Sequence, residues 1–347
     1  MSASERKRVL TFAVIIGLIA LMMWILSRIN SGGWYDVLKT VLTAYLIYCI
    51  LCAFYWRAVV TRRVYSIGAE PGNLLIIAPH QDDGVAIGGG HALLTHAMGF
   101  EVHVLFLTDG PEEDKKTRKQ EAVEAWSVMG LPEKNLHFLK HHTLSGFIDR
   151  EEIDSGIGEI AEAVRRYEPD TLIVPLYEGG NYQHDVANYM VTMAVRKAGR
   201  NINVYEASEY NFFYSFRSTP EKMLSGLLRL IPFINHDYPP EPVRRDPVLH
   251  LKMSAEQIRI KREMLSRFLT QNPDRLVERF GFGDRYQKMH DYDYSKPPFN
   301  YDRSLARVLN ALKKLPALGR FVSGAVKWTR TIHPDPDYTI TRIPGLE

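Results

Sequence analysis

The pattern of hydrophobic and polar positions divides the chain into two parts. Two long uncharged apolar segments come first, at residues 9–27 and 40–56. From residue 73 to residue 210, short and nearly continuous apolar runs alternate with longer stretches of mixed polarity. Such alternation is typical of a mostly parallel sheet with helices on both faces, and continuous apolar runs are typical of strands that are buried on both sides. We therefore expect an α/β domain after the apolar segments.

The apolar runs and the turn residues between them predict the positions of the elements. We expect strands at 73–80, 101–110, 136–140, 171–176 and 203–210, and helices at 85–98, 115–130, 151–169 and 184–199. A further helix is expected at 254–271, because Ser254 and Gln257 have the spacing of a capping box. Parallel sheets of this kind bind ligands outside the carboxyl ends of their strands.

Three regions follow from this pattern. Residues 1–63 are expected to form a transmembrane hairpin, and residues 64–300 the main domain, with a core at 70–210 and an aromatic, proline-rich insert at 211–250. Residues 301–347 form a tail whose stretch 303–330 is basic and amphipathic. Such a stretch either lies on an anionic membrane surface or packs on the domain as a surface helix.

The two apolar segments are close to the length that a helix needs to cross a bilayer. A cleaved signal peptide is the competing interpretation of the first, but a second apolar segment follows and no small-residue cleavage site does. Basic residues flank the pair on its outer sides, whereas the short loop holds Arg28 and Lys39. These outer residues are Arg6, Lys7, Arg8, Arg57, Arg62 and Arg63. The positive-inside rule then predicts a two-pass membrane protein with both ends and the main domain in the cytoplasm.

Composition narrows the possible functions. The net charge of +3 over 347 residues is too small for a general nucleic-acid binder. Cys49 and Cys52 are the two cysteines of the chain, and both fall within the second apolar segment, where we expect small buried hydrophobes rather than a redox pair. A chain without a disulfide framework fits a reducing cytoplasm.

Ionisable residues follow the first core strand directly. His80, Asp82 and Asp83 would be costly to bury there without a partner cation or solvent, and histidine with carboxylate is a ligand set that suits zinc. Two other interpretations compete: Asp82 or Asp83 as a cap of the next helix, and a nucleotide loop formed by Gly84 and Gly88–Gly90. A nucleotide loop needs its glycines in the turn itself, and the acidic pair would repel a pyrophosphate. We therefore expect no nucleotide cofactor, and interpret the glycines as positions where a helix packs closely on the sheet.

A second strand end supplies a further histidine. The strand predicted at 171–176 leads through a glycine-rich turn to His184, at the start of a helix. Because the carboxyl ends of parallel strands lie at one edge of a sheet, we expect His184 to lie near His80 and Asp83.

Three motifs together resemble a known family. The runs "PHQDD", then "TDG" followed by Arg118 and Glu121, then "EGGNYQHD" resemble the PIG-L/LmbE-like zinc-dependent de-N-acetylases. That family shows H-P-D-D after its first strand, an Arg-x-x-Glu helix after the second, and H-P-D-H after a later strand. The likeness covers about residues 70–210, and "KREMLSRFLTQ" extends a weaker match to about 290. The resemblance implies a Rossmann-like sheet and hydrolysis of an N-acetyl group from an amino sugar.

The resemblance also implies roles for individual residues. It implies His80, Asp83 and His184 as ligands of Zn²⁺, with another divalent metal such as Fe²⁺ as the alternative, and Asp82 as the general base. It implies that Arg118 contacts substrate, while Asp109 at the second strand end could bind sugar hydroxyls and Glu121 could pair with Arg118.

Two positions depart from the pattern. Gln81 replaces a proline, with no expected effect on ligation, and Asn181 replaces the first histidine of H-P-D-H. Asn181 can donate a hydrogen bond to an oxyanion but cannot transfer a proton, so the acid is left open between Asp82 and another group. His141 and His142 are weaker candidates, and the run "HPDPD" at 333–337 is assigned no role.

The combined expectation is a membrane-anchored zinc deacetylase for an N-acetylated amino sugar carried on a lipid. The membrane bilayer is the expected partner, with no nucleic acid and no nucleotide. Two alternatives stay open: a zinc amidohydrolase for a soluble glycoside or acylated amine, and a catalytically weak carbohydrate-binding or scaffold protein.

Overall fold

The structure is a computed structural model that divides into two compact units, one holding helix α2 and the other the sheet. It describes residues 33–55, 64–110, 113–141, 150–178, 181–209, 243–245, 247–281 and 283–294, and the single residues 17, 21, 24 and 239. The tail 301–347, with its "HPDPD" run, and most of the insert predicted at 211–250 lie outside these ranges.

Helix α2, Trp34–Tyr55, includes residues 40–55 of the second apolar segment predicted at 40–56. The first segment, 9–27, lies outside the described residues except for the single helical residues 17, 21 and 24. Within the ranges given above, no helix has both the length and the apolar character needed to cross a bilayer.

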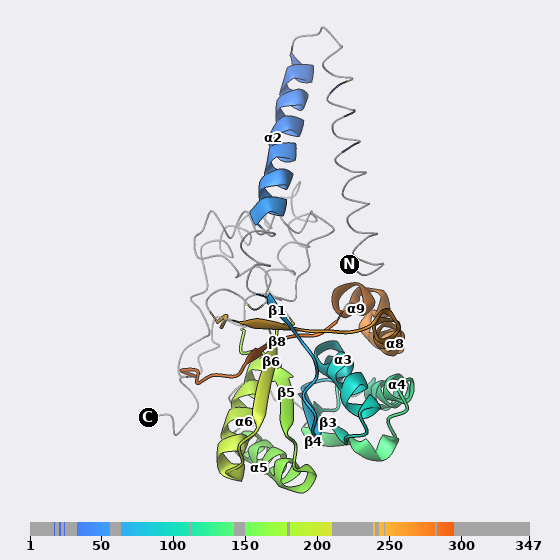
Figure 1. Cartoon of the computed structure of the whole chain (residues 1–347), viewed down its shortest axis with the longest axis vertical. Coiled ribbons are helices and arrows are strands. Elements are labelled where there is room, and N and C mark those ends of the chain that lie inside the picture. Colours follow the sequence, from blue (N-terminus) through green and yellow to red (C-terminus); the bar gives the residue numbers. More distant parts are fainter. Residues whose placement is uncertain are drawn as a thin grey trace. The chain divides into compact units, whose positions relative to one another are not determined.

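The second unit is built on one mixed sheet (Figure 1). Its strands are β1 Val64–Ile67, β2 Leu74–Ala78, β3 Val102–Thr108, β4 Leu136–His141, β5 Thr171–Pro175, β6 Asn203–Ala207, β7 Val248–Leu251 and β8 Arg285–Lys288. They lie in the order β1-β7-β8-β6-β5-β2-β3-β4. Strands β4, β3, β2, β5 and β6 pair in parallel, while β8 pairs antiparallel with both β6 and β7. The expected α/β architecture with a mostly parallel sheet is confirmed.

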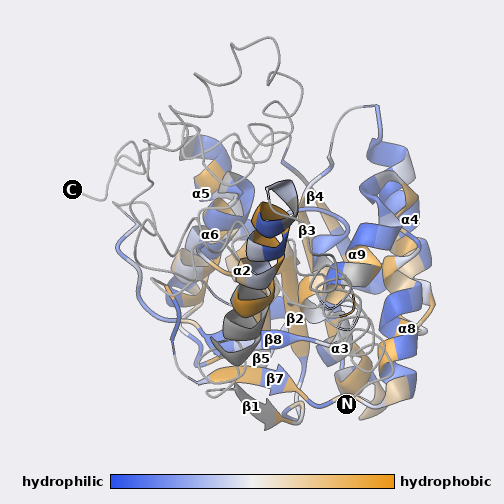
Figure 2. Ribbon diagram, turned by 90° about the horizontal axis from the view of Figure 1, so that it is seen from above, coloured by the Kyte–Doolittle hydropathy of each residue, from blue (hydrophilic) through white to orange (hydrophobic). Residues whose placement is uncertain are grey.

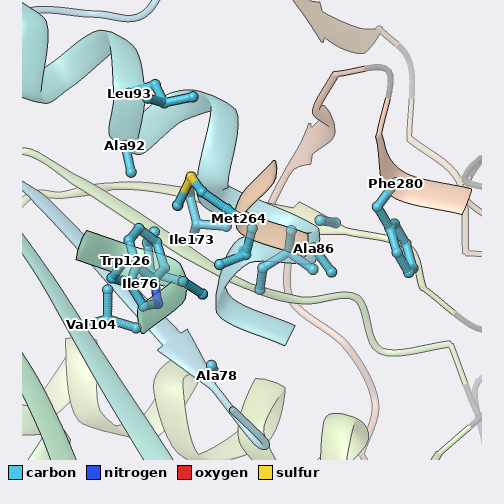
Figure 3. Close-up of a cluster of buried hydrophobic side chains, with 14 of the residues drawn as sticks. Ile76, Ala78, Ala86, Ala92, Leu93, Val104, Trp126, Ile173, Met264 and Phe280 are labelled. Atoms are coloured by element: carbon cyan, nitrogen blue, oxygen red, sulfur yellow. The ribbon is translucent and has the colours of Figure 1, made fainter. Parts of the chain in front are cut away.

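Helices cover both faces of this sheet. They are α3 Asp83–Ala97, α4 Lys115–Ser127, α5 Arg150–Tyr167, α6 Tyr182–Ala198, α8 Ala255–Leu265 and α9 Pro273–Phe280, with short 3-10 turns at η2 Glu133–Asn135 and η4 Leu269–Gln271. Strand residues point alternately to the two faces. In β2, Ile76 packs in one apolar layer with Trp126 of α4 and Met264 of α8 (Figure 3), and Leu75 and Ile77 pack in the opposite layer with α5 and α6. Figure 2 shows hydrophilic and hydrophobic residues on the same helices, as expected of helices that pack on a sheet with one side and face solvent with the other.

The glycines after the first strand belong to the packing of α3 on the sheet. A Cβ atom at Gly88 would lie 2.6 Å from Cδ1 of Ile76 in β2, and one at Gly90 would lie 2.5 Å from the sulfur of Met253. Both distances are far below a normal contact. The interpretation of close packing on the sheet is therefore confirmed for Gly88, whereas Gly90 packs on the segments that follow β7 and precede β8, and Gly89 faces Lys261 of α8.

The helix predicted at 254–271 is wrong at its carboxyl end. The Ser254–Gln257 capping box is present, but α8 ends at Leu265 and is followed by η4 and then α9. Phe268, with φ −83° and ψ 69°, leaves the helical conformation, so α8 does not continue into η4. Asn272, with a positive φ of 59° and a proline after it, then separates η4 from α9. Its side chain instead accepts from the backbone N–H of Arg275 and begins α9.

Candidate metal and active site

The candidate site lies where the strand order reverses. From β2 the chain runs to β3 and β4 on one side, and then to β5 and β6 on the other side of β2. Helices α3 and α6 begin just after β2 and β5. In open parallel sheets, such a switch point leaves a crevice outside the carboxyl ends of the strands.

The turn after β2 is fixed by hydrogen bonds to β3. Thr108 donates to the carbonyl oxygen of Pro79 from its backbone N–H at 3.1 Å and from its hydroxyl at 2.7 Å. Gln81 is buried, and its side-chain Nε2 donates to the carbonyl oxygen of Thr108 at 2.6 Å. Gln81 therefore anchors the turn, while His80, Asp82 and Asp83 occupy the positions around it.

His80, Asp83 and His184 come together at this point. Oδ2 of Asp83 lies 2.8 Å from Nδ1 of His80 and 3.2 Å from Nε2 of His184, and one ligand atom from each of the three residues lies within 4.8 Å of the others. Oδ2 also accepts from the backbone N–H of His80 at 2.8 Å, which holds the carboxylate in place. Two imidazole nitrogens and one carboxylate oxygen are a donor set that fits Zn²⁺, and related divalent cations.

The local electrostatics favour a positive charge beside Asp83. Burial opposes ionisation of Asp83, but His184 and His80 offset it, so the pKa of Asp83 lies well below its usual value. For His80, burial lowers the pKa, but the charge and hydrogen bond of Asp83 act more strongly and raise it to about 9. A cation held by these residues would balance the negative charge of the same Asp83 carboxylate.

Asp82 stands in a different environment from its neighbour. It occupies the N-cap position of α3, but its side chain makes no capping hydrogen bond. The competing interpretation of Asp82 as a helix cap is therefore wrong. Burial and then the adjacent charge of Asp83 raise the pKa of Asp82 to about 7, against the attraction of His80 and Arg118. A carboxyl group poised near neutral pH suits proton transfer.

Comparison with known proteins identifies the domain that carries this site. Residues 75–195 match the PIG-L family, described as GlcNAc-PI de-N-acetylase. Residues 75–195 are a PIG-L family domain. Among curated proteins, none matches the chain.

Solved structures with a similar arrangement share little sequence with this chain. The conserved protein TT1542 from Thermus thermophilus is 24% identical with a TM-score of 0.35, covering 46% of this chain and 77% of that one. A deacetylase of the teicoplanin biosynthetic pathway is 14% identical with a TM-score of 0.44, covering 63% and 100%. The N,N'-diacetylchitobiose deacetylase from Pyrococcus horikoshii is 15% identical with a TM-score of 0.39, covering 75% and 94%.

The second histidine motif of the PIG-L domain begins α6. Asn181 is the N-cap of this helix, and its side-chain oxygen accepts from the backbone N–H of Gln183 at 2.9 Å. The oxygen is thus used for capping, so any hydrogen bond to a substrate would come from the amide Nδ2. The motif also brings the Gln183 side chain to His80, with Oε1 2.5 Å from Nε2.

The Arg-x-x-Glu helix of the PIG-L domain docks on η4. Glu121 accepts from the backbone N–H of Thr270 at 2.8 Å and from its hydroxyl at 2.6 Å. The expected partner of Glu121, Arg118, instead donates to Gln271: with the amide oxygen turned toward the guanidinium, its distances to Nη1, Nη2 and Nε are 2.6, 2.9 and 2.9 Å. The "TQ" pair after α8 thus orients both residues of this motif.

The remaining candidates lie at neighbouring strand ends. Asp109 follows β3, with Oδ2 3.7 Å from Nζ of Lys115 at the start of α4. His141 ends β4 and pairs with Glu159 of α5 at 2.8 Å, while His142 lies outside the described residues.

Three polar residues of the site were not predicted from the sequence. Glu209 follows β6, is buried, and has Oε1 3.5 Å from Nδ1 of His184; burial and the charges of Asp83 and Asp82 raise its pKa well above the usual value. Glu178 follows β5 and accepts from the backbone N–H of Glu209 and from the hydroxyl of Ser208. The rule that located His184, a polar residue at a strand end, could have found both glutamates. The third, Gln183, gave no such signal.

Proposed function

We propose that the PIG-L domain is a metal-dependent deacetylase that hydrolyses the N-acetyl group of an amino sugar. The observation that carries the proposal is the convergence of His80, Asp83 and His184 beside the partly buried carboxyl group of Asp82. The match of residues 75–195 to a family described as GlcNAc-PI de-N-acetylase supports the same reaction.

His80, Asp83 and His184 would hold the metal, and Zn²⁺ fits this donor set. When bound, the cation supplies Lewis acidity toward the acetyl carbonyl and the attacking water. Fe²⁺ is the alternative metal, since imidazole and carboxylate ligands accept it as well.

Asp82 would act as the base. Its carboxylate takes a proton from water as the water oxygen bonds to the amide carbon, and returns that proton to the amine nitrogen as the C–N bond breaks. The products are acetic acid and the free amine of the sugar, which ionise to acetate and an ammonium group, so atoms and charge balance. Returning the proton through Asp82 requires no second acid, which matters because Asn181 cannot transfer one.

Arg118 and Asp109 would bind the sugar. Gln271 holds the guanidinium of Arg118 from one side, so the group is ordered before substrate arrives. Asp109 lies at the end of β3, the strand adjacent to β2, and can accept hydrogen bonds from sugar hydroxyls.

The preferred substrate is an N-acetylated amino sugar linked to a lipid, acted on by a two-pass membrane protein with its PIG-L domain in the cytoplasm. The uncharged segments 9–27 and 40–56 support this, as do exposed apolar side chains on α2, among them Val37, Val41 and Ile47 at 54%, 57% and 52% exposure. A soluble glycoside or acylated amine is the competing substrate.

The test is release of free amine from an N-acetylglucosaminyl lipid by the purified full-length protein with Zn²⁺. Asp82→Asn is expected to lower the rate about 10²- to 10⁴-fold while the metal remains bound. Asp274→Asn, at an exposed position of α9, is the matched control and should keep the wild-type rate. If the metal-loaded wild type releases no more amine than Asp82→Asn, the domain is a binding protein and the enzyme proposal fails.

A further inference from the structure

Gln183 lies between the two halves of the candidate metal site. It is the second residue of α6, directly before His184, and its half-buried side chain reaches the end of β2. There its Oε1 lies 2.5 Å from Nε2 of His80. The backbone of Gln183 is itself fixed, because its N–H donates to Oδ1 of the N-cap residue Asn181 at 2.9 Å.

The contact determines which ring nitrogen of His80 keeps its hydrogen when a cation binds. An amide oxygen can only accept, so Nε2 of His80 must be the donor. Nδ1 lies 2.8 Å from Oδ2 of Asp83 and donates to it, so a bound cation would replace the hydrogen on Nδ1 and use the lone pair of that atom. A neutral imidazole in the other tautomer would present its hydrogen, not its lone pair, to the ligand cluster.

His184 lies on the other side of Asp83, and its contacts are longer than those of His80. Its Nε2 lies 3.2 Å from Oδ2 of Asp83, and its Nδ1 lies 3.5 Å from Oε1 of Glu209. The hydrogen bond between an outer oxygen and a ligand histidine is therefore the one from His80 to Gln183. Such outer partners fix the tautomer and orientation of ligand histidines.

We propose that Gln183 is a positioning residue that sets the tautomer of His80 for metal binding. The inference rests on the proposed metal site. Gln183 supplies an acceptor without adding charge, where four carboxyl groups already lie close together, those of Asp82, Asp83, Glu178 and Glu209. A further carboxylate would increase their mutual repulsion in the absence of a cation.

The test measures metal affinity rather than activity. The full-length protein is stripped with a chelator and titrated with Zn²⁺, and with Co²⁺ followed by its visible absorption. Gln183→Met, which keeps length but removes the acceptor, is expected to weaken Zn²⁺ binding about 10- to 100-fold and to change the Co²⁺ spectrum. Gln183→Glu keeps the acceptor and should bind Zn²⁺ at least as tightly as wild type, with a near-native Co²⁺ spectrum.

Gln120→Met, at an exposed position of α4, is the matched control and should bind Zn²⁺ like wild type. If Gln183→Met binds Zn²⁺ with wild-type affinity and an unchanged Co²⁺ spectrum, the positioning role is wrong, although the metal site stands. Equal weakening in Gln183→Met and Gln183→Glu also overturns it, because then packing and not the acceptor matters. If the wild type binds neither ion, the proposed metal function fails as well.

Discussion

Asp82 and Asp83 are adjacent in sequence, yet their environments shift their pKa values in opposite directions. Asp83 faces two histidines, which hold its pKa well below the usual value. Asp82 is partly buried beside that charge, and its pKa rises to about 7. Pairs of ionisable groups with separated pKa values are a common sign of divided roles in catalysis. This division supports the proposed roles, with Asp83 as a metal ligand and Asp82 as the group that transfers the proton.

Gln271 is expected to act through Arg118. Its amide oxygen lies within hydrogen-bond distance of all three guanidinium nitrogens. We predict that Gln271→Leu frees Arg118 to move and raises KM about 10-fold, the cost of about 1.4 kcal/mol of lost substrate binding. Steady-state kinetics on an N-acetylated amino sugar checks this.

The control for Gln271→Leu is Gln120→Leu, an exposed substitution on α4 that should leave KM unchanged. If KM is unchanged in Gln271→Leu, the orientation of Arg118 by Gln271 does not contribute to substrate binding.

At the scale of elements, the close approach of α3 to β2 depends on Gly88. A Cβ atom there would lie 2.6 Å from Cδ1 of Ile76, so we predict that Gly88→Ala lowers the free energy of unfolding by about 1–3 kcal/mol. Ile76→Val removes Cδ1 and alone costs about 0.5–1.5 kcal/mol. Because Ile76→Val also removes the clash with the new Cβ atom, the double variant should lose less free energy of unfolding than the two single variants lose together. Denaturant unfolding of the three variants measures the coupling, and strict additivity would contradict the contact.

Glu206 connects β6 to the segment after β8 through a buried network. It accepts from Asn188 at 2.8 Å, from Tyr292 at 2.7 Å and from Gln287 at 3.1 Å. Burial nevertheless raises its pKa from 4.5 to about 7. The folded state then holds a proton that the unfolded chain releases, so stability falls as the pH rises from about 4.5 to about 7.

We predict that Glu206→Gln removes this part of the pH dependence. The pKa shift from 4.5 to about 7 corresponds to about 3 kcal/mol in the free energy of unfolding. Wild type should lose this amount as the pH rises through that range, whereas the free energy of unfolding of the variant should not change. Thermal unfolding at pH 5 and pH 8 measures the difference, with the exposed substitution Glu133→Gln as the control. Identical pH profiles for wild type and Glu206→Gln would show that Glu206 does not titrate in this range.

The elements that the sequence predicted are those whose burial leaves a local pattern. Strands β2, β3 and β5 are buried at every position, so their apolar runs are continuous and visible. Strands β7 and β8 are four residues each and mix apolar with charged or polar side chains, so their place between β1 and β6 has no comparable pattern in the sequence. His80, Asp83 and His184 were predicted because strand ends of a parallel sheet converge. Gln183 was not, because its proposed role depends on how the cap at Asn181 directs its side chain to His80.

For the whole molecule, the proposed orientation in the membrane follows from charge on either side of the apolar segments. Arg6–Arg8 and Arg57, Arg62 and Arg63 outnumber Arg28 and Lys39, so the loop between the segments should face away from the cytoplasm. We predict that a single cysteine at Ser31, in a chain with Cys49 and Cys52 replaced by serine, reacts with an impermeant maleimide on intact cells. A single cysteine at Ser304, in the tail, should react only after permeabilisation. The reverse labelling pattern would place the PIG-L domain on the opposite side of the membrane. If neither site is labelled before permeabilisation and an alkaline wash extracts the protein fully, the proposal of a membrane hairpin is wrong. A lipid-linked substrate would then lose its main support, and the soluble glycoside would become the substrate to test first.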